Sequence, residues 1–194
     1  MQASTPSAFT FASPAGEKER ISRIQQAVRA IPDFPKEGIL FRDITTVLRD
    51  PRLFQETISL FADALAGLKV DYIVGIESRG FILGAPLATQ LNAGFVPVRK
   101  RNKLPGLVER HEYDLEYGSD CVEIHIDAIE PGARVVIVDD LLATGGTASA
   151  AAKLVGKLNA QLVALMFLIE LSELNGREKL PSDVPIKAFI DFGG

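Results

Sequence analysis

Apolar residues recur with helical spacing in two stretches near the start of the chain. In residues 17–31 they lie three or four positions apart, as they do on one face of a helix. Residues 50–67 open with an Asp that can cap a helix and a Pro that suits its first position. We therefore expect two helices, separated by a segment in which Pro32 and Pro35 prevent a helix from continuing.

From residue 72 onward, short apolar runs alternate with helical patterns. Runs that are apolar throughout, such as residues 135–138, are typical of strands buried on both faces of a sheet. The expected strands are 72–77, 94–98, 122–127, 134–138 and 161–169, and the expected helices are 81–91 and 146–158. Strands that alternate with helices favour an α/β fold with a mainly parallel, twisted sheet flanked by helices.

Residues 99–120 interrupt this alternation. They are polar, contain Pro105, Gly106 and Gly118, and show no sustained period. So long an irregular stretch is uncommon inside a compact domain and often forms a loop that covers an active site. We expect a flexible lid loop here.

Composition and charge narrow the range of functions. The first sixteen of the 194 residues carry no charged side chain and are rich in Ser, Ala, Thr and Pro, which favours a disordered tail over a targeting signal. We expect residues 17–194 to form a single domain. A formal net charge of −4 argues against a nucleic-acid partner. No apolar run approaches the ~18 residues of a membrane span, so we expect no membrane partner either.

Cysteine and histidine are scarce. The single cysteine, Cys121, fits a reducing compartment, so we expect a cytoplasmic protein in which this thiol is a small packing residue. His111 and His125 are too few for a histidine-rich metal centre and argue against Ser-His-Asp chemistry. We expect both to be solvated or structural.

The most informative segment is VVIVDDLLATGGT, residues 135–147, in which a buried strand leads through two acids and a glycine-bearing turn into a helix. Successive strand side chains point to opposite faces, so Asp139 and Asp140 should have different tasks, one at a sugar diol and the other at a water or metal. The turn can present backbone N–H groups and hydroxyls to a phosphate at the helix N-terminus. Its candidate phosphate-binding residues are Ala143, Thr144, Gly145, Gly146 and Thr147.

Two alternatives bear on this segment. The acids and glycines could serve only as a helix cap and a tight turn, although two adjacent carboxylates after a β-branched strand would be an odd way to make one. Other nucleotide-binding loops do not match: the chain lacks G-x-x-x-x-G-K-[ST], and Gly75, Gly80 and Gly84 have the wrong spacing for G-x-G-x-x-G. The pattern therefore predicts a site for a monophosphate beside a diol.

The segment 135–147 resembles the phosphoribosyl-pyrophosphate motif of the type I phosphoribosyltransferases, and its DDLLATGGT variant is similar to that of the adenine-specific members. Further segments agree in order and spacing, so the likeness covers about residues 20–190. These segments are FPKEGILFRDIT (34–45), VGIESRGFILG (74–84), VRKRNKLPG (98–106), DLEYG (114–118) and ELSELNGREKL (170–180). The resemblance implies a parallel sheet with a small N-terminal hood and a flexible lid.

The resemblance also implies an activity. Adenine and 5-phosphoribosyl-1-pyrophosphate would give AMP and pyrophosphate, with Mg²⁺ held mainly by substrate and water, in a homodimer whose neighbouring subunit can supply a basic contact. A 6-oxopurine or orotate transferase would share the phosphate site, but FRDIT and KLPG point away from both. A regulator that only senses phosphoribosyl pyrophosphate would need a DNA-binding module, and the tail supplies none.

Basic residues are carried over for the pyrophosphate. Ser78 and Arg79 match the family's pyrophosphate-binding loop, and Arg79 is the one to which we assign a catalytic role. Arg99 and Lys103 match further basic contacts, although a short basic run can equally be a solvated charge cluster. We assign Lys100 and Arg101 to the surface.

The lid and the purine pocket complete the implied site. Glu116 could exchange the base proton once the lid closes, with Tyr117 beside it, or it could be a solvent-facing acid. The purine would lie at Leu40, Phe41 and Arg42 with Leu141 opposite. Phe41 could equally be a core residue, and Asp43 could simply pair with Arg42. The chain departs from the family at Asn102, where glycine is frequent, and over 107–113.

Overall fold

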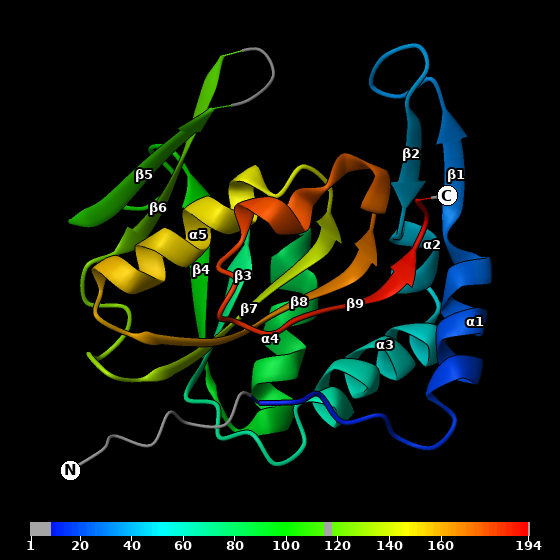
Figure 1. The fold of residues 1–194 in the computed structure, drawn as a ribbon, viewed down its shortest axis with the longest axis horizontal. Coiled ribbons are helices and arrows are strands. Elements are labelled where there is room, and N and C mark those ends of the chain that lie inside the picture. Colours follow the sequence, from blue (N-terminus) through cyan, green and yellow to red (C-terminus); the bar gives the residue numbers. More distant parts are fainter. Residues whose placement is uncertain (1–8, 115–117, 194) are drawn as a thin grey trace. The chain divides into compact units, whose positions relative to one another are not determined.

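The computed structural model describes residues 9–114 and 118–193 (Figure 1). Within these residues the chain forms two compact units, one of residues 12–65 and the other of residues 9–11 and 66–193. The first half of the predicted tail lies outside the described residues. Nearer the first helix, the N–H of Ala12 donates to the carbonyl of Ala64 (3.1 Å).

The larger unit is built on a seven-stranded sheet in the order β5-β6-β4-β3-β7-β8-β9. The five neighbouring strands β4, β3, β7, β8 and β9 run parallel, whereas β6 is antiparallel to both of its neighbours, β5 and β4. The strands are β3 (Tyr72–Ile76), β4 (Gly94–Lys100), β5 (Val108–Asp114), β6 (Ser119–His125), β7 (Arg134–Leu142), β8 (Gln161–Glu170) and β9 (Ile186–Asp191). The predicted, mainly parallel sheet is confirmed, and β9 is an additional strand.

Two helices cover opposite faces of this sheet, α4 (Arg79–Leu91) and α5 (Gly146–Lys157) (Figure 1). The strands β3, β7 and β8 are buried on both faces, and β7 contacts both helices. Two short 3₁₀ turns, η1 (Ser172–Leu174) and η2 (Gly176–Lys179), follow β8. No helix in the described residues is both long and apolar enough to cross a membrane.

The irregular stretch predicted over 99–120 is confirmed for residues 101–107 and wrong for 99–100, 108–114 and 119–120, which belong to strands. There β4 continues to Lys100, and β5 and β6 form an antiparallel hairpin whose second strand overlaps the predicted strand 122–127. Strand β5 shows no apolar alternation because it is polar on both faces. On one face Glu109 pairs with Lys157 of α5 (3.4 Å), and on the other Arg110 pairs with the buried Glu123 of β6 (2.7 Å).

Cys121 and the histidines also belong to this hairpin. Cys121 is a buried free thiol in β6, which confirms its packing role. His111 lies in β5, where burial and the charges of Lys153 and Lys157 lower its pKa. Nδ1 of His125 lies 3.4 Å from the carbonyl oxygen of Leu107. Both histidines are therefore structural.

The smaller unit packs three helices and one hairpin. Its elements are α1 (Glu17–Ala27), β1 (Arg29–Pro32), β2 (Leu40–Asp43), α2 (Thr45–Leu48) and α3 (Pro51–Ala64). As predicted, Asp50 caps α3 by accepting from the N–H groups of Arg52 (2.9 Å) and Leu53 (3.1 Å), with Pro at the first helical position. The helix ends at Ala64, slightly before the position expected.

The hairpin of β1 and β2 is not among the predicted elements. Each strand has only four residues, too few for an alternating pattern to stand out, and Pro32 lies within β1. The two strands pair antiparallel, with Arg29 opposite Asp43. This register brings a basic and an acidic side chain together at the base of the hairpin.

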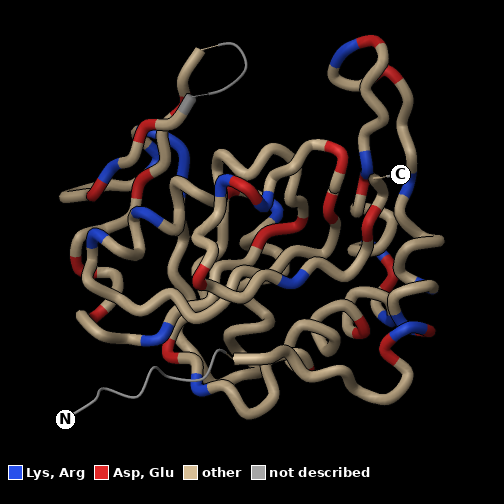
Figure 2. The backbone as a smooth tube through the Cα atoms, viewed as in Figure 1, with Lys and Arg blue, Asp and Glu red and all other residues tan. Residues whose placement is uncertain are grey.

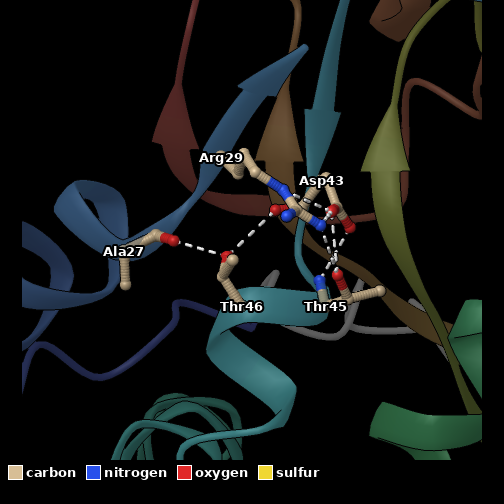
Figure 3. Close-up of polar contacts among 5 residues, drawn as sticks. All are labelled: Ala27, Arg29, Asp43, Thr45 and Thr46. Carbon is tan, nitrogen blue, oxygen red and sulfur yellow. Dashed lines mark hydrogen bonds and ion pairs between the residues drawn. The ribbon is translucent and has the colours of Figure 1, made fainter.

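Asp43 holds this unit together at the point where β2 meets α2 (Figure 3). Its carboxylate accepts from Arg29 Nε (3.0 Å), from the Thr45 N–H (2.9 Å) and from the Thr45 hydroxyl (2.8 Å). Burial alone would raise the pKa of Asp43, but these bonds outweigh burial and lower the pKa to about 2. The structure pairs Asp43 with Arg29.

Replacing Asp43 should destabilise the protein in a pH-dependent way. Since the folded pKa lies below the unfolded value of about 3.9, the carboxylate contributes about 2.5 kcal/mol at neutral pH, and about half of this is lost by pH 3. We expect Asp43→Asn to lower the free energy of unfolding by about that amount at pH 7. Denaturant titrations at pH 7, 5 and 3 measure the difference from the parent chain, which should shrink as the pH falls.

Glu56→Gln is the matched control, because Glu56 makes an exposed ion pair with Arg23 in the same unit. Such pairs contribute less than about 1 kcal/mol, so its effect should be smaller at every pH. An Asp43→Asn effect that did not change between pH 7 and pH 3 would contradict the assignment.

Candidate active site

Two acids lie side by side near the end of β7. Burial alternates along this part of the strand, with Asp139 half-buried and Asp140 buried, so the two side chains point to opposite faces of the sheet as predicted. The buried carboxylate of Asp140 pairs with Arg79 through Nε (2.9 Å). Asp139 Oδ1 accepts from the N–H of Asp140 (2.9 Å).

The environment of these acids disfavours two negative charges. Burial raises the pKa of Asp139 well above its usual value, and the charge of Asp140 raises it further. Burial also raises the pKa of Asp140, but the guanidinium of Arg79 opposes that effect. Asp140 is therefore the member of the pair that keeps its charge more readily. A carboxyl such as Asp139, with a pKa moved toward neutrality, can both donate to and accept from sugar hydroxyls.

The turn after β7 is fixed by contact between two stretches of backbone. Gly145 has a φ of +76°, and a Cβ added to it would lie 2.1 Å from the carbonyl oxygen of Gly176. A Cβ on Gly176 would lie equally close to the carbonyl oxygen of Ala143. Arg177, the next residue, anchors this contact to β8 by a double hydrogen bond with the Glu170 carboxylate (2.7 and 2.6 Å). Only glycine satisfies both positions.

After this turn, α5 begins with backbone N–H groups that make no hydrogen bond within the helix. The first bond of the helix runs from the N–H of Ser149 to the carbonyl of Gly145, which leaves the N–H groups of residues 146–148 without a partner inside the helix. Gly145, the N-cap, has no side chain to cap them. These donors and the helix dipole favour an anion here.

A small cavity opens at this point, with a volume of about 100 Å³. A water occupies roughly 30 Å³ of liquid, so the cavity can take a group of phosphate size. It is lined by Asp139, Leu141, Leu142, Ala143, Thr144, Gly145, Gly146, Thr147 and Ala148. The structure thus brings together every residue of the predicted phosphate loop, with Asp139 and Leu141 beside it.

Arg79 is the first residue of α4. The sequence pattern had placed it in a loop before the helix. The start of α4 approaches β7 closely, since a Cβ on Gly80 would lie 2.7 Å from the carbonyl oxygen of Val138. This contact sets Arg79 against Asp140. Ser78 precedes the helix and is exposed, and the peptide bond between Glu77 and Ser78 is cis.

Arg99 lies in β4 and Lys103 follows the end of that strand; Lys and Arg are drawn blue in Figure 2. Arg99 pairs with Glu77 through two nitrogens (both 3.2 Å) and donates to the carbonyl of Lys103 (2.8 Å). Burial alone would raise the pKa of Glu77, but Arg99 and the N–H of Lys100 lower it. Arg99 is therefore held in place next to the Ser78–Arg79 segment, while Lys103 is exposed.

Lys100 is the residue that sequence reasoning missed. It was expected at the surface, yet its ammonium pairs with Asp120 and donates to the hydroxyl of Tyr113 (2.9 Å). Tyr113 in turn contacts the hydroxyl of Thr147 (2.9 Å) in the predicted phosphate loop. The signal was present in the strand pattern, because Lys100 shares a face of β4 with the buried Val96 and Val98. Arg101 is exposed as expected and pairs with Glu112.

Several candidate residues are not brought into this cluster. Leu40, Phe41 and Arg42 lie in β2 of the smaller unit, where Phe41 packs edge-on against Phe34 with ring centres 5.1 Å apart. Glu116 and Tyr117 lie outside the described residues. The assignment of these five residues to the site stays a prediction.

A larger cavity, of about 720 Å³, lies in the smaller unit along α1 and α3. Two of its arginines are already paired within that unit, Arg20 with Asp63 and Arg23 with Glu56. None of the candidate residues lines it. This cavity is therefore a weaker candidate for the active site than the smaller cavity at the N-terminus of α5.

Comparisons with known proteins point to one family. The family model described as "Phosphoribosyl transferase domain" matches residues 43–191. Adenine phosphoribosyltransferase of Nostoc punctiforme is 59% identical over 171 residues, which cover 87% of this chain and 99% of that protein. The chain belongs to the adenine phosphoribosyltransferase family. A relative of the same name from Agrobacterium fabrum is 49% identical over 89% of this chain and 97% of its own length.

Solved structures give the same result. The crystal structure of adenine phosphoribosyltransferase from Thermoanaerobacter pseudethanolicus superposes with a TM-score of 0.86 at 53% identity and covers 89% of this chain and 99% of its own. The Saccharomyces cerevisiae enzyme, solved in complex with an imino-altritol bisphosphate and adenine, gives 0.84 at 46% identity over 88% and 98%. Both the fold and the family are thereby established.

Gly145→Ala should disable the phosphate loop. The substitution forces a side chain into a left-handed conformation and against the Gly176 carbonyl, so we expect a loss of stability of about 1–3 kcal/mol or more. Affinity for ribose 5-phosphate, measured by calorimetry, should fall by at least roughly tenfold, because the N–H donors of α5 no longer converge.

Gly156→Ala is the matched control in the same helix. Gly156 is exposed, and a Cβ there meets open space. The variant should be as stable as the parent or more so by about 0.5–1 kcal/mol, with unchanged affinity. If Gly145→Ala bound ribose 5-phosphate like the parent, the loop would not be the phosphate site.

Proposed function

We propose that this protein transfers the 5-phosphoribosyl group of 5-phosphoribosyl-1-pyrophosphate to adenine, giving AMP and pyrophosphate. The observation that carries the proposal is the uncapped N-terminus of α5, which opens on a phosphate-sized cavity lined by Asp139, with the buried Asp140 next to it in the chain. The identity to adenine phosphoribosyltransferases over nearly the whole of their length supports the choice of base.

The phosphate loop binds the 5′-phosphate and directs the ribose. Backbone N–H groups of residues 145–147 and the hydroxyls of Thr144 and Thr147 donate to phosphate oxygens, and the helix dipole adds to their attraction. Asp139, which lines the same cavity, lies within reach of the ribose hydroxyls. Asp140 points to the other face and holds Arg79.

The basic residues serve the leaving group. Departure of pyrophosphate builds positive charge at the sugar carbon and negative charge on the leaving oxygens. Ser78 and Arg79 bind the pyrophosphate, with Arg99 and Lys103 as further contacts. Because Arg79 is held by Asp140 and Arg99 by Glu77, both guanidinium groups are oriented before substrate arrives. A preorganised donor of this kind is typically worth about 3–4 kcal/mol of barrier.

Magnesium accompanies the substrate in this proposal. No group of three or more His, Cys, Asp or Glu in residues 9–114 and 118–193 could hold a metal ion by itself. Mg²⁺ is typically bound by one or two carboxylates together with substrate phosphates and several waters. Asp140 is paired with Arg79 and points away from the face of Asp139, so the two acids form no joint metal site and the ion is held mainly by substrate and water. When bound, it supplies positive charge to the departing pyrophosphate.

The lid residues handle the proton in the proposed reaction. Attack by N9 of adenine requires a proton to leave the imidazole ring or an equivalent shift of tautomer. Glu116 is the proposed acceptor, since dehydration of a carboxylate raises its pKa into the range needed for proton exchange. Tyr117 stands beside it in the chain, and closure over the site would exclude water from the sugar carbon.

The proposed adenine-binding residues are Leu40, Phe41, Arg42 and Leu141, as the resemblance to the family implies. Leu141 lines the cavity next to the phosphate loop. Leu40, Phe41 and Arg42 supply an aromatic face and backbone groups that can read the edge of a 6-aminopurine. We further propose that the protein works as a homodimer in the cytoplasm, a compartment that suits its single buried thiol.

A base-selectivity assay tests the activity. Purified protein, Mg²⁺ and phosphoribosyl pyrophosphate are mixed separately with adenine, hypoxanthine, guanine or orotate, and nucleotide formation is followed by absorbance and chromatography. AMP from adenine, with at least roughly hundredfold lower rates for the other bases, is expected. Preference for hypoxanthine, guanine or orotate would contradict the choice of base. Binding of phosphoribosyl pyrophosphate without any product would indicate a sensor and contradict catalysis.

Glu116→Gln tests the proton acceptor. The amide cannot take up the proton, so turnover should fall by roughly 10²-fold or more, while both Michaelis constants change by less than about threefold. Steady-state kinetics with adenine and phosphoribosyl pyrophosphate separate the two effects. Glu112→Gln is the control, because Glu112 is an exposed acid four residues earlier in the chain and pairs with the surface residue Arg101. Equal turnover in Glu116→Gln and the parent would remove the assignment.

A further inference from the structure

The hydroxyl of Tyr113 lies where four elements of the larger unit meet. Tyr113 belongs to β5, and its oxygen lies 2.9 Å from Lys100 Nζ at the end of β4 and 3.1 Å from Asp120 Oδ2 in β6. It also lies 2.9 Å from Thr147 Oγ1 in the first turn of α5. One oxygen atom thus links the β5–β6 hairpin to the phosphate loop.

Two of these three neighbours carry fixed charges. Burial alone would lower the pKa of Lys100, but Asp120 and Tyr113 raise it above its usual value. Burial alone would raise the pKa of Asp120, but Lys100 and the N–H of Cys121 lower it. At neutral pH, Lys100 is therefore an ammonium that can only donate, and Asp120 is a carboxylate that can only accept.

Tyr113 has a single proton to share between Asp120 and Thr147. In one arrangement it donates to Asp120, and Thr147 must then donate its own proton to the Tyr113 oxygen. In the other arrangement Tyr113 donates to Thr147, whose proton is then free for another acceptor. Lys100 donates to the Tyr113 oxygen in both arrangements.

Phosphate binding selects the second arrangement. The oxygens of a phosphomonoester dianion accept hydrogen bonds, so Thr147 can bond to one only if its proton points away from Tyr113. Asp120 loses little in the exchange. Its Oδ2 keeps the ion pair with Lys100, and its Oδ1 keeps the N–H of Cys121 (2.7 Å).

We propose that Tyr113 is a positioning residue for the 5′-phosphate, which turns its proton from Asp120 to Thr147 when a phosphomonoester occupies the loop. The lysine and the aspartate hold the phenol in place, and the phenol orients and polarises the Thr147 hydroxyl. This proposal rests on the proposed function, in which the loop containing Thr147 takes the phosphate.

The first test compares Tyr113→Phe, Thr147→Val and the double variant by calorimetry. Tyr113→Phe should weaken binding of ribose 5-phosphate by roughly three- to tenfold, the effect of one hydrogen bond, and leave the affinity for adenine unchanged. In steady-state kinetics, the KM for phosphoribosyl pyrophosphate should rise with little change in kcat. The double variant should bind ribose 5-phosphate no more weakly than Thr147→Val, because Tyr113 acts through that hydroxyl.

Asp120→Asn, unlike Tyr113→Phe, should not weaken the binding of ribose 5-phosphate. It removes the charged acceptor that competes with Thr147 for the Tyr113 proton, so affinity for ribose 5-phosphate should stay the same or increase by roughly two- to threefold. A role in folding alone predicts weaker binding from both Tyr113→Phe and Asp120→Asn. This second variant also keeps the proposal testable should Tyr113→Phe fail to fold.

The outcomes separate this proposal from the one it rests on. If Thr147→Val weakens ribose 5-phosphate binding but Tyr113→Phe does not, or if their effects add, Tyr113 has no positioning role and the phosphate loop stands. If Thr147→Val itself has no effect, both assignments fail. Weaker binding in Asp120→Asn with an unchanged unfolding midpoint would also overturn the role of Tyr113.

Discussion

The site depends on the burial of an acid at the carboxyl end of β7. A buried carboxylate is stable only with a cation beside it, and Arg79 is that cation for Asp140. The pairing fixes the first residue of α4 on the end of β7, and Gly80 makes the close approach possible. The ion pair that allows Asp140 to be buried therefore also positions the Arg79 guanidinium, which is expected to face the leaving group.

The phosphate loop is fixed in a different way, by the absence of side chains. Gly145 and Gly176 bring two segments more than thirty residues apart into backbone contact, and Arg177 ties the second segment to β8 through Glu170. The N-terminus of α5 is therefore defined by the ends of two neighbouring strands. Its donors can converge on an anion without a loop having to order first.

Much of this could be predicted from the sequence, where local patterns carry the information. The apolar runs of β7 and β8 and the segment 135–147 were sufficient for the parallel sheet and the phosphate loop. Strand β5 is not predicted because its partners are charged groups of α5 and β6, which leave no apolar period. Lys100 is predicted at the surface because a lysine in a basic run is usually solvated. Its acid partner lies twenty residues away, so only the face that Lys100 shares with Val96 and Val98 gives a local signal.

The cations around the site share a property with a wider consequence. Arg79, Arg99 and Lys100 each have an acid of the same chain as partner, in Asp140, Glu77 and Asp120. An approaching polyanion thus meets a surface that is already neutralised, and attraction at a distance is weak. The choice between ligands therefore depends on the shape of the site and, at short range, on whether the ligand can replace the acid that pairs with each cation.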